Sequence, residues 1–246
     1  MHKFKLVLKS LGLTLVLVII KIVVDILGLD SLETSPVITA IVAGVIFTIA
    51  IIFSGVLSDY KEAEKIPGEI AASVKSLYRD VGTADKLNND LSIEMRSHIK
   101  SLVGVIVDNF QHNRWKLSEI NAEIDIVDMD INTLYDKGLP PPIVVKMRNE
   151  LAIIEKLANR VEIIMETQFI PAAYHISIAS TVLVLLIVLF TRMDPLYVGI
   201  LLYGAVSFVL TSLLLLIHDM DNPFEVRKGA VADVDLRIIY KVNNSL

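Results

Sequence analysis

Residues 37–57 read VITAIVAGVIFTIAIIFSGVL, a stretch that is apolar almost throughout and contains no charged residue. A helix needs roughly 20 apolar residues to cross the hydrocarbon core of a bilayer, so this stretch predicts a transmembrane helix. Three other apolar runs have a comparable length. The four predicted spans are residues 6–29, 37–57, 174–190 and 196–217. Short connections join the first span to the second and the third to the fourth, which predicts two hairpins.

The composition of the whole chain also indicates a membrane protein. Of its 246 residues 54% are hydrophobic and 21% are charged, whereas soluble domains are about 45–50% apolar and about 25% charged. The alternative is a large soluble helical protein, but four such runs leave too little polar surface to cover them. The absence of cysteine excludes disulfides and thiolate metal sites. The net charge of −5 gives no basic footprint for nucleic acid.

Lysine and arginine predict the orientation, because they gather on the cytoplasmic side of membrane proteins. They precede the first span, follow the fourth, and number fourteen between residues 58 and 169. The loop of the first hairpin has none, and the loop of the second has only Arg192. We therefore expect a multi-pass protein of the plasma membrane in which both hairpin loops point outward and both termini are cytoplasmic.

These patterns predict an all-α membrane protein with four transmembrane helices and a large cytoplasmic helical domain between spans 2 and 3. Its parts are a first hairpin (1–58), the cytoplasmic domain (59–169), a second hairpin (170–218) and a cytoplasmic tail with a short helix (219–246). In the cytoplasmic domain, apolar residues recur every three or four positions. Thr83 is a candidate cap for a helix whose apolar stripe starts at Leu87, and Pro67-Gly68 should kink the helix that continues the second span.

No motif of the chain predicts an active site, so we expect no catalytic residues, no metal and no cofactor. His218, Asp219, Asp221 and Glu225 resemble a cluster of hard-metal ligands. They lack the glycine and the terminal glutamate of a calcium-binding loop, and a solvated helix end explains them better. His98 and His112 belong to no recognisable motif.

Lys21 and Asp25 form a candidate charge pair inside the first span. They lie four residues apart, hence on one face of a helix, at a depth where charge is costly. One interpretation is a mutually neutralising pair near the outer interface, with Lys21 extending its amine outward. The other is that the pair lines a water-filled path or locks a contact between subunits.

Two segments resemble the bestrophin family. Residues 49–79, IAIIFSGVLSDYKEAEKIPGEIAASVKSLYR, are similar to the second bestrophin span and its cytoplasmic extension. After the last span, Asn222-Pro223-Phe224 resembles the family's Asn-Pro-Phe-Gly, and a short helix at residues 233–239 is expected to follow. The spacing of the four spans agrees with the family over most of the chain.

The resemblance implies a bestrophin-like ion channel, a homopentamer in membrane lipid with one central pore lined by the second span of each subunit. Permeant inorganic ions, chloride in the family's usual case, would pass a neck of apolar side chains. The face that the resemblance assigns to the pore consists of Thr39, Ala43, Phe47, Ile51 and Ser54. Rings of bulky apolar side chains can gate by dewetting. The alternative is that Phe47 and Ile51 face lipid or a neighbouring helix.

Departures from the family pattern limit this inference. The acidic run that clasps calcium in animal bestrophins is replaced by Glu225-Val-Arg-Lys-Gly229. Residues 58–169 hold 19 acidic and 14 basic residues, a balance of −5 per subunit that favours cations at a vestibule. Anion selectivity is therefore not carried over. Two other functions stay open, a non-conducting scaffold or sensor that acts through its cytoplasmic helices, and a membrane enzyme that uses Asp219, Asp221 and Glu225.

Overall fold

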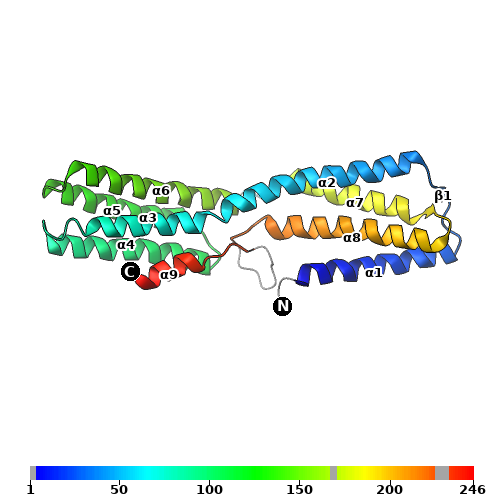
Figure 1. Cartoon of the computed structure of the whole chain (residues 1–246), viewed down its shortest axis with the longest axis horizontal. Coiled ribbons are helices and arrows are strands. Elements are labelled where there is room, and N and C mark those ends of the chain that lie inside the picture. Colours follow the sequence, from blue (N-terminus) through cyan, green and yellow to red (C-terminus); the bar gives the residue numbers. More distant parts are fainter. Residues whose placement is uncertain (1–3, 167–170, 225–232) are drawn as a thin grey trace. The chain divides into compact units, whose positions relative to one another are not determined.

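The structure of this protein is a computed structural model that describes residues 4–166, 171–224 and 233–246. It is almost entirely helical, with two very short strands (Figure 1). The elements in chain order are α1 (Lys5–Ile26), β1 (Leu32–Glu33), α2 (Pro36–Ala63), α3 (Ile66–Val81), α4 (Asn89–Gln111), α5 (Leu117–Asp136), α6 (Pro141–Glu166), α7 (Pro171–Leu189), β2 (Thr191–Arg192), α8 (Leu196–Met220) and α9 (Arg237–Ser245).

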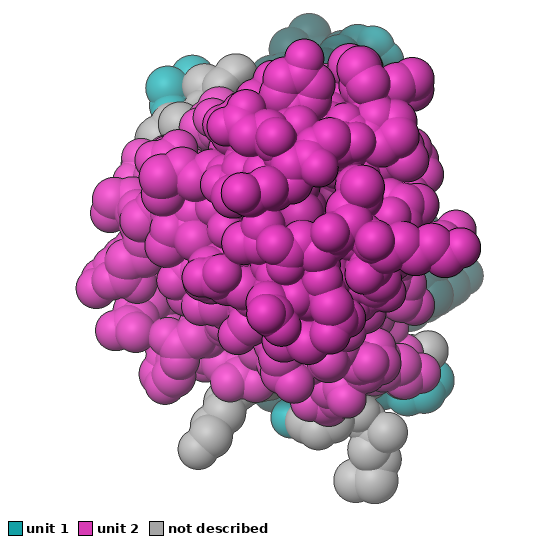
Figure 2. Space-filling view, turned by 90° about the vertical axis from the view of Figure 1, so that its left-hand side faces the viewer, with its two compact units in different colours: residues 1–60, 168–221, 227–232 teal, residues 61–167, 222–226, 233–246 magenta. Residues whose placement is uncertain are grey.

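The chain divides into two compact units, which Figure 2 colours separately. The transmembrane unit contains Met1–Tyr60, Gln168–Asp221 and Arg227–Ala232. The bundle unit contains Lys61–Thr167, Asn222–Val226 and Asp233–Leu246. Four helices of the described chain, α1, α2, α7 and α8, are long and apolar enough to cross a membrane, which agrees with the four spans predicted from the apolar runs.

In the transmembrane unit, α1 packs along α8, and α7 packs along α8 as well. A side chain at position 204 would begin 3.3 Å from Cγ2 of Val18, so Gly204 lets α1 and α8 approach closely. The two interhelical loops are also joined. Leu32 pairs with Thr191 and Glu33 with Arg192 in a parallel register, and the Leu32 amide donates to the Phe190 carbonyl at 3.0 Å. The sequence offered no signal for this strand pair.

In the bundle unit, α3 packs against α4 and α6, and α5 packs against the same two helices. The four helices thus form a square in which α4 and α6 occupy opposite corners, and α9 covers the side formed by α3 and α4. The apolar stripes predicted from the sequence supply the core. Met95, Ile106 and Phe110 of α4 are fully buried, as are Ile131 of α5 and Ile154 of α6. Each such side chain contributes about 1.5–3 kcal/mol on burial.

Ion pairs join neighbouring helices of the square. His98 of α4 contacts Asp130 of α5 at 2.7 Å, and burial raises the pKa of the Asp130 carboxyl, an effect that His98 opposes. Lys146 of α6 contacts Asp80 of α3, also at 2.7 Å. Both pairs are partly buried and partly open to solvent, which weakens their attraction, so they mainly define which helix faces meet.

Three details differ from the expectations. The helix after the second span is interrupted at residues 64–65, within one turn before Pro67-Gly68, rather than kinked at that pair itself. Helix α2 ends at Ala63, and Pro67 lies in the first turn of α3, where its missing N–H costs nothing. Thr83 is not a cap, since its hydroxyl donates to the Asp80 carbonyl at 2.7 Å. The short helix of the tail begins at Arg237 rather than Asp233.

The true cap of α4 is Asn88. Its backbone is extended, and its side-chain oxygen accepts a hydrogen bond from the Leu91 amide at 3.1 Å. Leu87 therefore precedes the helix and is 45% exposed. Asparagine is among the strongest N-cap residues because it satisfies one of the free amides of the first turn.

We predict that Asn88→Ala lowers the stability of the bundle unit by about 1 kcal/mol, because this amide loses its acceptor. Trp115 is the only tryptophan of the chain and lies 4.7 Å from the Phe110 ring, so its fluorescence during urea unfolding reports on this unit. Asn89→Ala is the matched control, since Asn89 is exposed within the first turn of α4. Equal stability of the two variants would contradict the assigned cap.

Candidate pore-lining helix and the buried charge pair

The second span, α2, has one buried side and one bare side within the protomer. Only 6% of the residues in its apolar window are buried, compared with 22% for α1 and 28% each for α7 and α8. Ile49 and Val56 are buried in a cluster that includes Val184 and Val188 of α7. These α2 residues lie seven positions apart, so they mark a single face of the helix.

The five residues predicted to line the pore all lie on the bare side of α2. Phe47 is 67% exposed and Ile51 is 57% exposed. Thr39, Ala43 and Ser54 are exposed as well. At 100° per residue, this set is centred roughly opposite Ile49. The structure thus brings the five residues onto one continuous face, while what covers that face lies outside a single protomer.

The predicted charge pair is present and buried. Nζ of Lys21 lies 2.7 Å from Oδ1 of Asp25, and their side chains are 1% and 4% exposed. The amine does not extend outward to water, so that part of the first interpretation is wrong. Instead, Lys21 donates hydrogen bonds to two backbone carbonyls, those of Leu189 at 3.0 Å and Thr191 at 2.8 Å.

The Leu189 carbonyl is at the end of α7, where the last carbonyls of a helix have no partner within it, and the Thr191 carbonyl belongs to β2, which follows closely. The ammonium group satisfies them and interacts favourably with the negative end of the helix dipole. Lys21 therefore fastens α1 to α7, close to the strand pair that joins the two loops. The carbonyl partners are 168 and 170 residues away in the chain, so only the pairing with Asp25 was predictable from sequence.

The motif after the last span anchors the tail to the bundle unit. The Phe224 side chain is 1% exposed and its ring lies 5.6 Å from the ring of Phe110. The carbonyl of Pro223 accepts a hydrogen bond from the Val234 amide at 2.9 Å. Asn222 belongs to the same segment of this unit. The motif thus packs against α4 through Phe224, and the Pro223–Val234 hydrogen bond joins it to the segment before α9.

The acidic residues near the end of α8 do not form a recognisable metal centre in the described part of the chain. Among the residues that the structure describes, no group of three or more histidine and acidic side chains is placed to hold a metal ion. The His218 ring stacks on Tyr174 at 5.9 Å. Glu225, the fourth member of the predicted cluster, lies outside the described residues.

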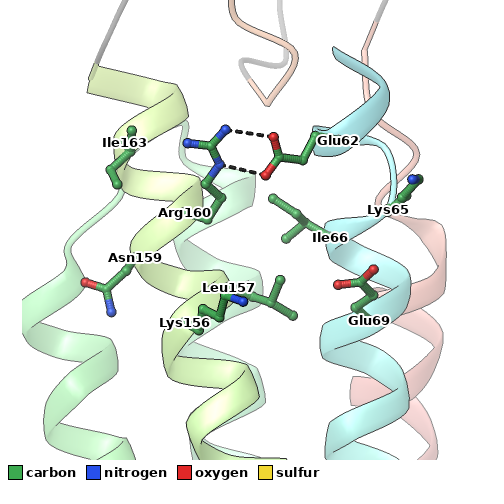
Figure 3. A pocket seen from close by; sticks show the side chains of 9 residues that line it. All are labelled: Glu62, Lys65, Ile66, Glu69, Lys156, Leu157, Asn159, Arg160 and Ile163. Carbon is green, nitrogen blue, oxygen red and sulfur yellow. Dashed lines mark hydrogen bonds and ion pairs between the residues drawn. The ribbon is translucent and has the colours of Figure 1, made fainter. Parts of the chain in front are cut away.

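A groove of about 600 Å³ runs between α3 and α6 in the bundle unit (Figure 3). Glu62 and Arg160 point toward one another across it, with oxygen–nitrogen distances of 2.9 and 2.7 Å. Ile66 and Leu157 form its apolar wall, and Lys156 and Glu69 lie farther along it. Glu62 is in the last turn of α2 and belongs to the bundle unit, so this ion pair joins two segments of that unit.

We predict that Lys21→Met destabilises the protein by about 3–5 kcal/mol, because it leaves the Asp25 carboxylate buried without its partner. Thermal unfolding of the detergent-solubilised protein measures this loss. Lys21→Met with Asp25→Asn should recover part of it, since the unpaired charge is then removed. Lys9→Met, which changes an exposed lysine of the same helix, is the control. A Lys21→Met variant as stable as this control would show that the pair does not hold α1 to α7.

No protein-family model matches this chain, and no curated protein matches it in sequence. Solved structures do match. A bacterial bestrophin homolog from Klebsiella pneumoniae superposes with a TM-score of 0.78 at 16% identity, over 97% of this chain and 96% of that chain. A variant of that homolog gives 0.79 at 15% identity over 98% and 96% of the two chains. A structure described as a membrane protein gives 0.80 at 15% identity over 97% and 96%.

This similarity confirms, at the level of the fold, the resemblance that residues 49–79 and the Asn222-Pro223-Phe224 motif suggested. It extends beyond those short segments to both units. The matched 97% of this chain includes the four candidate spans and the helices of the bundle unit. The chain is therefore a membrane protein with a bestrophin-like fold over nearly its whole length.

Proposed function

We propose that this protein is a homo-oligomeric ion channel, a pentamer, that conducts ions passively through a central pore lined by α2. The bestrophin-like fold supports the assignment to the ion channels. The observation that carries the proposal is the bare face of α2, where Thr39, Ala43, Phe47, Ile51 and Ser54 are all exposed in the protomer. In this proposal, copies of α2 surround the pore and turn that face toward it.

The composition of the bare face suits this role. Residues 37–57 carry no charge, and Ala40, Ala43 and Gly44 are exposed on it. Small residues let helices approach closely in a membrane. Phe47 and Ile51, one turn apart, would then form two apolar rings. Rings of this kind exclude water when narrow and admit hydrated ions when they widen, which is gating by dewetting.

Lipid is the other possible cover for an apolar face, because acyl chains solvate apolar side chains well. Two features favour a pore instead. The face includes the hydroxyl groups of Thr39 and Ser54 near the two ends of the span. In addition, α2 is the span with the smallest buried share in the protomer, as expected for a helix whose main contacts are with other copies.

The bundle unit is expected to favour cations at the entrance of this pore. Its acidic excess is concentrated on α5, a helix that has no lysine or arginine and carries Glu119, Glu123, Asp125, Asp128, Asp130 and Asp136. Repetition of this helix around a ring would give a negative potential in the vestibule. In this proposal the channel lies in the plasma membrane, with the bundle unit and both termini in the cytoplasm, and the distribution of lysine and arginine supports this orientation.

We predict that Phe47→Ala raises the single-channel conductance in planar bilayers several-fold, because it removes one apolar ring of the constriction. Ile41→Ala is the matched control, since Ile41 is 38% exposed on another side of α2 and should leave the conductance unchanged. In a salt gradient, the reversal potential of the parent channel should lie toward the equilibrium potential of the cation, because the acidic side chains of α5 favour cations. An oligomer that conducts no ion in liposomes would contradict the proposal and would instead fit a scaffold or sensor.

A further inference from the structure

We propose that neighbouring copies of this chain meet through two different helix faces of the bundle unit. The outer face of α6 on one copy would pack against the outer face of α4 on the next. This inference rests on the proposed function, because it takes the oligomer as given. It adds which surfaces form the contact and how they are aligned.

Helix α6 carries two apolar stripes on opposite sides. The first points into the bundle and comprises Val144, Met147, Leu151, Ile154, Ala158 and Val161, which are all buried. The second, which we call the α6 outer face, comprises Val145, Asn149, Ala152, Ile153, Lys156 and Ile163. Val145, Ile153 and Ile163 are 57%, 41% and 49% exposed. Val145, Asn149, Ala152, Lys156 and Ile163 are spaced three, four or seven residues apart, as in a helix–helix seam.

The described residues leave Val145, Ala152 and Ile153 of this outer face exposed. On one side of it, Lys146 and Arg160 reach toward α3 and the end of α2. On the other side, Arg148 contacts Asp128 of α5 at 3.3 Å. Lys156 lies between these two sides and is exposed, and its charge helps to lower the pKa of the Glu62 carboxyl. A helix that is apolar on two sides is typical of an element that packs against partners on both.

The α4 outer face has the complementary character. It comprises Asp90, Ser97, Ser101, Gly104 and Asp108, with Glu94 beside them, and lies opposite the buried stripe of α4. A side chain at position 104 would meet nothing within 4 Å, so the surface there is open. Small residues leave a shallow path between acidic side chains. The apolar and lysine side chains of the α6 outer face fit such a path in both shape and charge.

The placement of the two faces suits a ring. A cyclic oligomer needs two different surfaces on roughly opposite sides of each subunit, because every copy contacts one neighbour with each. Helices α4 and α6 occupy opposite corners of the bundle, since each packs against α3 and α5. Their outer faces therefore point in opposite directions, as a closed ring requires.

The alignment of the two faces follows from their contacts with α3. Arg96 of α4 lies 5.7 Å from the Tyr78 ring, and Lys146 of α6 contacts Asp80. Both helices run antiparallel to α3, so Ser101 is level with Ala152 and Ile153. A rotation about an axis along the bundle keeps these levels. Ser101 of one copy then lies opposite Ala152 of the next, and Lys156 comes within one helical turn of Asp108.

Disulfide trapping tests this arrangement directly, because the chain contains no cysteine of its own. Ser101→Cys and Ala152→Cys are introduced together, and the oligomer is oxidised in native membranes. A disulfide forms when the Cα atoms are about 4.4–6.8 Å apart. Opposite corners of one bundle do not meet this condition, but the proposed contact does. The expected result is loss of the monomer band and a ladder that ends at the number of subunits.

The controls separate this contact from others. Each single variant should remain monomeric, because the contact joins unlike positions. Ala72→Cys with Asp125→Cys is the matched pair, since these exposed residues lie at about one level on α3 and α5, the other two corners. It should give no ladder. A ladder from this pair equal to that from Ser101→Cys with Ala152→Cys would mean random collision and would overturn the inference.

Ala152→Trp provides a second test without oxidation. A bulky ring at the centre of the contact should shift the purified protein to smaller species in size-exclusion chromatography with light scattering. Ala122→Trp, at an exposed position of α5, should not. An intact oligomer that shows neither the ladder nor the shift would overturn this interface but leave the channel proposal standing. A parent protein that is monomeric in membranes would overturn both.

Discussion

The buried amine of Lys21 is the interaction on which the arrangement of the spans depends. It connects α1 to the end of α7 through the carbonyls of Leu189 and Thr191, while α8 packs along both helices. The cost of burying this charge is offset by the paired Asp25 and by hydrogen bonds to two backbone carbonyls, one of which is at the end of α7. As a result α1, α7 and α8 are tied together. Helix α2 is attached by one face, and its opposite face is left for contacts outside the protomer.

The bundle unit likewise buries one face of its helices and leaves other faces exposed. Its core is complete within one chain, because the four helices bury one stripe each and the tail returns through Phe224 and α9 to cover one side. The exposed side chains of this unit are unevenly distributed. Acidic side chains gather on α5, and apolar side chains remain on the α6 outer face. Each unit therefore leaves one largely apolar helix face exposed, which is what a subunit of a larger assembly presents.

Much of the fold could be predicted from the sequence because its signals are local. Long uncharged runs predicted the spans, and apolar spacing predicted α4, α5 and α6 together with their buried stripes. The predicted start of α4, with Thr83 as its cap, was wrong. Leu87 continues the apolar spacing but precedes the helix, and Asn88 is the cap. The strand pair and the carbonyl partners of Lys21 were beyond reach. They join segments far apart in the chain through backbone atoms. Every residue has the same backbone atoms, so the amino-acid sequence does not indicate which of them will pair.

The predicted pore residues illustrate the boundary between these two cases. Periodicity alone places Thr39, Phe47 and Ile51 on one side of α2, but it does not say which side packs inside the protomer. The buried Ile49 and Val56 settle that point. Whether the bare side meets water, lipid or another copy depends on assembly, which neither the sequence nor a single protomer contains.

Thiol accessibility along α2 tests the central claim most directly. Single cysteines placed at each position from 37 to 57 of this cysteine-free chain can be exposed to a charged, water-soluble thiol reagent while current is recorded. If copies of α2 surround a water path, the reagent should alter the current at positions 39, 43, 47, 51 and 54 and leave it unchanged at 49 and 56. Modification that follows no helical face, or none at those five positions, would contradict the account.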